Sequence, residues 1–178
     1  MTDTSAKNEA TPFWHFSLHF YRQAGVADAC LAMQDGCGVD VNLLLFLLWR
    51  AAAGQLLSAE EVKKLDEQVR DWRNLAIGPL REARRRLKNA PTLVEPTKQE
   101  AFRTKVKAIE LEAERLQQEA LYAFTRSEPP SAPAASAAPA AAARANIAAY
   151  ERAMGASFPK NAVAVLLGAF GRIALQGR

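Results

Sequence analysis

The residues best placed to do chemistry lie around a glycine-rich turn. Asp35, Cys37, Asp40 and Asn42 surround the sequence Gly36-Cys37-Gly38 and precede the most apolar segment of the chain. The exposed N–H groups and the dipole at the start of a helix favour an anion at such a place. The same field would make the Cys37 thiol more reactive. One hypothesis is therefore a small ligand-binding pocket formed by these four residues.

The same turn has a structural interpretation, which we favour. Asp40 directly precedes the apolar segment, and aspartate is among the residues that most often cap the N-terminus of a helix. Asn42 can tie the turn to a neighbouring element, since asparagine side chains readily bond nearby backbone groups. In this interpretation the polar residues stabilise the turn and bind no ligand.

A second cluster of such residues is basic. Arg81, Arg84, Arg85 and Lys88 fall along one face of a predicted helix, because residues three and four apart are neighbours on a helix surface. Such a face could neutralise the phosphates of nucleic acid or of acidic lipid. However, no aromatic residues are interleaved for base stacking. We favour a solvated face, or internal ion pairs with glutamates of a later helix. Those glutamates are Glu110, Glu112, Glu114 and Glu119.

Other polar residues have simpler explanations. His15 and His19 lie one helical turn apart, a spacing that can hold a metal ion, but the metalloprotease pattern His-Glu-x-x-His is not present. We therefore predict that they are solvated and that there is no metal site. Ser17 lies on the apolar side of the same helix, where its hydroxyl can bond a carbonyl one turn earlier. We assign no catalytic residue and no cofactor, and whether the protein is an enzyme stays open.

Helical periodicity predicts the elements that position these side chains. A first helix spans residues 12–23, with Thr11 as N-cap and Pro12 in the first turn, and a second spans 26–34. The segment 41–53 is apolar on nearly every side, as expected of a helix at the centre of a bundle.

Later helices are marked by capping residues and by proline. Ser58 and Glu61 form a capping box that opens a fourth helix, and Gly78-Pro79 is expected to end it and begin a fifth. The longest helix spans about 97–125, with apolar residues at heptad-like spacing. This spacing fits packing on the core or on another chain. The residues concerned are Phe102, Val106, Ile109, Ala113, Leu116, Ala120 and Ala123.

Composition divides the chain into a bundle and a tail. We expect a disordered N-terminus over residues 1–10, a bundle over 11–126, and a linker over 127–143, which is almost wholly alanine, proline and serine. Residues 144–178 are predicted to form a helical tail whose last helix docks on protein, either on the bundle or on a partner. The predicted fold class is all-α, a compact bundle of about six helices with a flexibly tethered helical C-terminal tail.

Overall composition limits the cellular context. The chain has 178 residues and a net charge of +4, enough for one ordinary domain. Cys30 and Cys37 lack Cys-x-x-Cys spacing, and the first residues contain no signal-peptide core, so we expect a cytoplasmic protein. The longest apolar stretch, 43–49, is far shorter than the roughly 20 residues of a membrane span, so no transmembrane segment is expected.

Several short strings carry a resemblance. They include Phe13-Trp14-His15-Phe16-Ser17-Leu18, Gln34-Asp35, Gly38-Val39-Asp40-Val41-Asn42-Leu43-Leu44-Leu45-Phe46 and Trp49. On these strings, residues 12–125 resemble a family of small, uncharacterised bacterial proteins, a domain of unknown function common in proteobacteria. The resemblance implies an all-helical cytoplasmic protein and brings no established activity, cofactor or substrate.

These patterns favour a non-enzymatic protein-interaction module. It would bind another protein or a second copy of itself, through the long heptad-patterned helix or the C-terminal helix. One alternative is a small-molecule or anion-binding protein, or an enzyme, with a pocket at the Asp35 to Asn42 turn. A second is nucleic-acid binding through the Arg81 to Lys88 helix, which is the less favoured partner.

Overall fold

The computed structural model describes residues 10–89, 94–127 and 136–176. The predicted all-α fold is confirmed, since every named element in these ranges is helical. The expected disorder of residues 1–9 and part of the expected linker, residues 128–135, lie outside the described residues. The elements are α1 (Pro12–Tyr21), α2 (Val26–Cys37), α3 (Val41–Ala52), α4 (Ala59–Trp72), the π-helix η1 (Arg73–Ile77), α5 (Gly78–Leu87), α6 (Pro96–Ser127), α7 (Pro139–Met154) and α8 (Lys160–Gln176).

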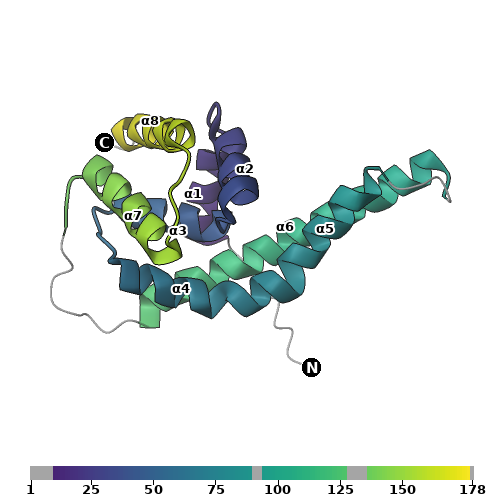
Figure 1. Ribbon diagram of the computed structural model, residues 1–178, viewed down its shortest axis with the longest axis horizontal. Coiled ribbons are helices and arrows are strands. Elements are labelled where there is room, and N and C mark those ends of the chain that lie inside the picture. The colour runs from purple at the N-terminus through teal and green to yellow at the C-terminus, as the bar shows by residue number, and fades with distance from the viewer. Residues whose placement is uncertain (1–9, 90–93, 128–135, 177–178) are drawn as a thin grey trace, which may run out of the picture.

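Two assemblies of helices make up the molecule (Figure 1). In the first, α3 is covered by α1 and α7, while α8 packs on α2 and α7. In the second, α4, η1 and α5 form one nearly continuous rod that packs along α6. The end of this pair, formed by α5 and the first half of α6, extends beyond the remaining helices as a two-helix arm (Figure 1). We call the remaining helices the bundle.

Helix α3 occupies the centre because nearly all of its side chains are apolar. Every residue from Asn42 to Leu48 is buried. Aromatic rings lock it to its neighbours: Phe13 of α1 contacts Phe46 at 5.4 Å between ring centroids, and Trp49 contacts Tyr122 of α6 at 5.6 Å. Neither α3 nor any other described helix combines the length and hydropathy that a membrane span requires.

The expected helix break at Gly78-Pro79 is wrong. The chain continues from α4 into α5 through η1, and the N–H of Gly78 donates to the carbonyl of Arg73, five residues earlier. In an α-helix, Pro79 would lose one backbone hydrogen bond and its ring would clash with the carbonyl four residues back. A wider π turn immediately before the proline lets the helix continue past it.

The C-terminal helices belong to the core. Helix α7 begins at Pro139, inside the segment expected to be linker, and Ala142 and Ala143 are fully buried. Their small side chains allow the backbones of α3 and α7 to approach closely, so alanine counts here as core rather than as spacer. Asn146 fixes this packing: its amide nitrogen donates to the carbonyls of Leu47 and Gln55, both at 3.0 Å. The expected tail is therefore helical, and it lies folded onto the bundle.

Candidate functional sites

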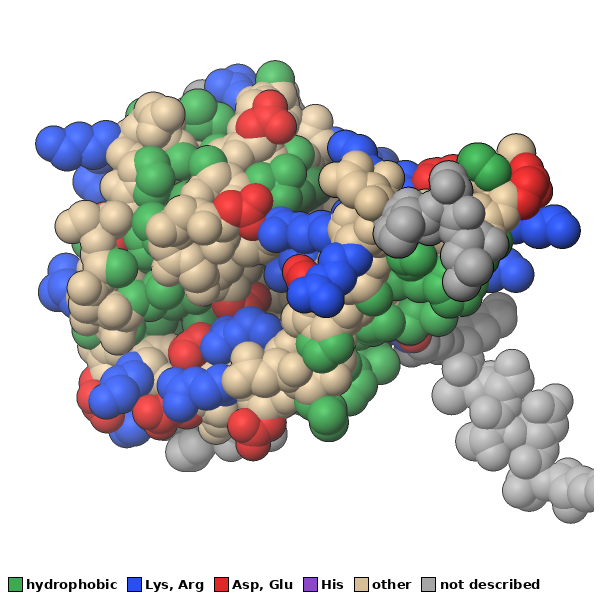
Figure 2. Space-filling view, turned by 45° about the vertical axis from the view of Figure 1, so that its right-hand side comes forward, with side chains coloured by type: hydrophobic (Ala, Val, Ile, Leu, Met, Phe, Trp, Pro, Cys, Tyr) green, Lys and Arg blue, Asp and Glu red, His purple; other side chains and the backbone are tan. Residues whose placement is uncertain are grey.

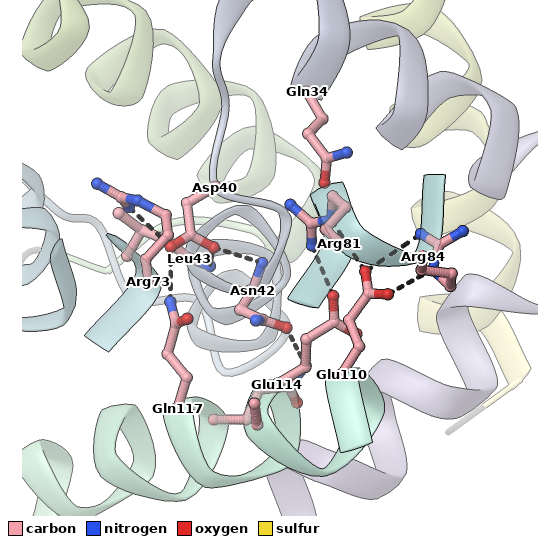
Figure 3. A network of polar contacts seen from close by, with 12 residues as sticks. Gln34, Asp40, Asn42, Leu43, Arg73, Arg81, Arg84, Glu110, Glu114 and Gln117 are labelled. Carbon is pink, nitrogen blue, oxygen red and sulfur yellow. Dashed lines mark hydrogen bonds and ion pairs between the residues drawn. The ribbon is translucent and has the colours of Figure 1, made fainter. Parts of the chain in front are cut away.

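Asp40 caps α3 and is also the centre of a buried polar network (Figure 3). One carboxylate oxygen accepts hydrogen bonds from the backbone N–H groups of Asn42 and Leu43, at 2.9 and 3.2 Å. The other accepts from the Arg73 guanidinium at 2.8 Å and from the Gln117 amide at 2.6 Å. Since each oxygen has two protein donors, the carboxylate is fully used inside the protein. The predicted structural role of Asp40 as a helix cap is confirmed.

Two partners connect Asp40 to more distant helices. Arg73 also bonds Asp66 of α4, at 2.8 Å. Burial opposes the charge of Arg73, but the hydrogen bonds and charges of Asp66 and Asp40 outweigh it and raise the pKa of the guanidinium. The hydroxyl of Tyr150 in α7 accepts the backbone N–H of Asp40 at 3.0 Å, and burial raises the pKa of this phenol. The network thus joins α3, α4, η1, α6 and α7.

The other predicted turn residues do not converge with Asp40. Asp35 is exposed and pairs with Arg85 at 2.7 Å, and this hydrogen bond lowers the pKa of its carboxyl. The Cys37 thiol donates to the carbonyl of Ser157 at 3.7 Å. Asn42 does tie the turn to a neighbour, because its side-chain oxygen accepts from the Gln118 amide of α6 at 2.8 Å. The turn residues therefore serve separate structural contacts.

Ion pairs occupy most of the predicted basic face. Arg81 bonds Glu110 at 3.1 Å and Glu114 at 2.7 Å, and Arg84 bonds both oxygens of Glu110 (Figure 3). Burial raises the pKa of Glu114, and the charge of Arg81 acts in the opposite direction. Lys88 is exposed. The predicted internal pairing with glutamates is thus confirmed for two of the arginines, and a phosphate would have to compete with the carboxylates for them.

Two adjoining cavities lie where the arm meets the bundle. The smaller, about 220 Å³, is bordered by Asp40, Arg73 and Gln117. The larger, about 480 Å³, lies among α1, α2, α3, α5 and α6, and its volume falls within the usual range of ligand pockets. Asp40 and Asn42 border the smaller cavity, only Asn42 of the predicted turn borders the larger, and Asp35 and Cys37 border neither. Figure 2 shows basic and acidic side chains gathered around the hollow between bundle and arm.

Three buried polar atoms near these cavities have no hydrogen-bond partner in the described part of the chain. They are Oγ of Ser17, Oε1 of Gln117 and Oε1 of Gln118. The expected bond from Ser17 to a carbonyl of its own helix is therefore wrong. The two glutamines were missed in the sequence, where the only signal is a pair of adjacent uncharged amides in a highly charged helix.

The histidines lie at the surface, as expected. His15 and His19 are both exposed and border neither of these cavities. Among the described residues there is no group of three or more histidine, cysteine, aspartate or glutamate side chains that could hold a metal ion.

The heptad pattern of α6 divides into a buried and an exposed row. Val106 and Ala113 are only 8% and 5% exposed. In contrast, Phe102, Ile109 and Leu116 follow one another at seven-residue spacing and are 56%, 56% and 41% exposed. We call this exposed row the α6 seam. Three large apolar side chains in one row on a helix surface are an unusual solvent-facing feature.

A family model described as a protein of unknown function, DUF2390, matches residues 12–121. The chain belongs to DUF2390. The matched region of this DUF2390 chain contains α1 to α5 and most of α6, and it includes every residue that borders the larger cavity. No curated protein and no solved structure matches the chain significantly. Since the DUF2390 description states no activity, the function has to be argued from the geometry.

Proposed function

We propose that this DUF2390 protein is an all-helical protein-interaction module that acts through the α6 seam. The observation that carries the proposal is the exposure of Phe102, Ile109 and Leu116 at seven-residue spacing. This spacing places the three side chains in one nearly straight row, which is the arrangement that a second helix can pack against. Burying such a row removes apolar surface from water, the main favourable contribution to most protein associations.

The position of the seam supports this role. It begins on the arm, which extends beyond the bundle and is free to be approached from its sides (Figure 1). Leu75 of η1, the most exposed large apolar residue described at 78%, adds apolar surface to the rod that packs along α6. The other segment considered from the sequence, the last helix, has Leu166, Ala169 and Phe170 buried within the same chain. The α6 seam is therefore the better interaction surface.

The charges beside the seam favour a second copy of the chain as partner. Lys98, Lys105, Glu112 and Glu119 also follow one another at seven-residue spacing, and at about 100° per residue they border the seam on one side. The first two are basic and the last two acidic, with Arg115 paired to both glutamates. When two copies of α6 pack antiparallel, Lys105 of one lies opposite Glu112 of the other, and the apolar rows overlap around Ile109. A self-complementary surface of this kind is what a twofold dimer requires.

Light scattering after size-exclusion chromatography over a concentration series tests the proposal. We expect a monomer–dimer equilibrium, which Ile109→Ser weakens by at least about tenfold, equivalent to about 1.4 kcal/mol. Lys105→Glu should weaken it and the double variant Lys105→Glu, Glu112→Lys should restore it, since the pair is reversed as a whole. Lys63→Glu, the same charge change on an exposed site of α4, is the matched control and should leave the equilibrium unchanged.

Two results would contradict the proposal. The first is a monomer at every concentration. The second is a dimer that Ile109→Ser leaves intact, which would place the interface elsewhere. Loss of dimer in Lys105→Glu without restoration in the double variant would contradict the antiparallel arrangement.

A further inference from the structure

We infer that the larger cavity binds a small amphipathic anion that has an aromatic or aliphatic body and an N–H or O–H donor. This site is separate from the α6 seam, because the cavity-facing residues of α6 lie on the opposite side of that helix. Leu111 borders the cavity and Ile109 belongs to the seam, and two residues apart on a helix correspond to about 200°.

The aromatic or aliphatic part of the ligand is indicated by the side chains that line the cavity. Large apolar or aromatic side chains from four helices border the cavity, namely Trp14, Leu18, Tyr21, Leu31, Leu45 and Leu111. Two of them are unusually exposed for large apolar side chains, since Leu31 is 42% and Leu111 49% exposed. An apolar body placed among them would cover surface that the protein itself leaves in contact with water.

The donor on the ligand is indicated by buried polar atoms. Ser17 and Gln118 border the cavity, are each only 3% exposed, and have an oxygen without a hydrogen-bond partner among the described residues. Gln118 already uses its amide nitrogen to bond Asn42, so the oxygen is the atom left to be satisfied. A buried acceptor without a donor is unfavourable. A ligand N–H or O–H would supply the missing donor, and the Ser17 hydroxyl can either donate or accept.

The negative charge of the ligand is indicated by the edge of the cavity. Four basic residues border it, against the two carboxylates of Glu110 and Glu114. Arg81 and Arg84 are held by these glutamates. Arg22 and Lys107 are exposed, and neither forms an ion pair with another described residue. They are therefore the basic groups available to an anion at the opening.

Fluorescence titration with 8-anilinonaphthalene-1-sulfonate tests the site, because this probe combines an aromatic body, an anilino N–H and a sulfonate. Its uncharged relative N-phenyl-1-naphthylamine has the same body and N–H without the charge. We expect saturable binding of one sulfonate probe per chain, with about tenfold weaker binding of the uncharged probe. Lys107→Gln should reduce this difference, since it removes a cation from the opening.

Matched tryptophan variants on opposite sides of α6 locate the probe. Leu111→Trp should abolish saturable binding by filling the opening, whereas Ile109→Trp should leave it unchanged. Both positions are exposed, so both variants are expected to fold, which circular dichroism checks. Ser17→Ala should weaken probe binding several-fold while raising the melting temperature of the unliganded protein, because it removes a buried hydroxyl that has no partner.

The inference is overturned if Ile109→Trp abolishes binding while Leu111→Trp does not, since the probe would then lie on the seam. It is also overturned if Ser17→Ala changes neither probe affinity nor melting temperature, or if the two probes bind equally well. These readouts do not depend on whether the chain forms dimers, so failure here and failure of the proposed interaction are distinguishable.

Discussion

The Asp40 carboxylate serves both as the cap of α3 and as the partner of Arg73. Its side chain is 4% exposed, whereas the Asp66 side chain, which bonds the same guanidinium, is 23% exposed. Removing it would leave the buried N–H groups of Asn42 and Leu43 and the Gln117 amide without an acceptor, whereas Arg73 would keep its bond to Asp66. We predict that Asp40→Ala lowers the free energy of unfolding by about 3–5 kcal/mol, from loss of the helix cap and from buried donors left without a partner, measured by urea denaturation. Asp66→Ala is the control and should cost about 1 kcal/mol. Equal losses in the two variants would show that burial does not decide the strength of this pair.

At the scale of single residues, the sequence predicts local interactions and misses those between residues far apart in the chain. The capping role of Asp40 follows from its place directly before an apolar helix. Its bonds to Arg73, Gln117 and Tyr150 join residues 33, 77 and 110 positions apart, and no periodicity in the sequence indicates such pairs. The unpartnered Ser17 was missed for a related reason, since the rule for serine in a helix assumes that the nearest carbonyl is the best acceptor.

At the scale of the element, most helices were predicted near their observed bounds. The errors occur where a local rule was overridden by its surroundings. Pro79 should end a helix, but the π turn of η1 lets the chain continue. The alanines at the start of α7 resemble a linker in composition, but they pack on α3 and shield one of its faces from water. The sequence predicts the heptad pattern of α6. Which of these residues are buried and which are exposed depends on where α5 lies.

The turn after α3 carries a prediction of its own. Gly54 has a φ of +75°, and a Cβ there would lie 2.7 Å from the carbonyl oxygen of Ala137, which leads into α7. Gly54→Ala should therefore lower the free energy of unfolding by about 2–3 kcal/mol, from backbone strain and from separation of the two segments. Gly36→Ala in α2 is the matched control, because a Cβ added there would meet no atom within 4 Å beyond its chain neighbours and its own helix backbone. It should stabilise the protein by about 0.5–1 kcal/mol. Thermal denaturation of both variants checks this, and a stable Gly54→Ala protein would contradict it.

At the scale of the whole molecule, the family match and the core do not coincide. The match ends at residue 121, whereas the main hydrophobic core of the described residues also contains Ile147, Tyr150, Leu166 and Phe170 from α7 and α8. A helix that is apolar on all sides must be covered on all sides. That property of α3 was visible in the sequence, and it could have indicated that the helices after the alanine-rich segment return to the bundle.

A chain shortened to residues 1–127 tests whether the matched region can fold alone. Without α7 and α8, one face of α3 would be exposed to water, and the backbone N–H of Asp40 would lose the Tyr150 hydroxyl. We therefore predict that the shortened chain loses the sharp thermal transition of the full chain, although circular dichroism still shows helix. Adding a separate peptide of residues 136–178 should restore a cooperative transition, since it returns the missing cover. If the shortened chain melts as sharply and at the same temperature as the full chain, α7 and α8 are an accessory layer, and α3 does not need them to be stable.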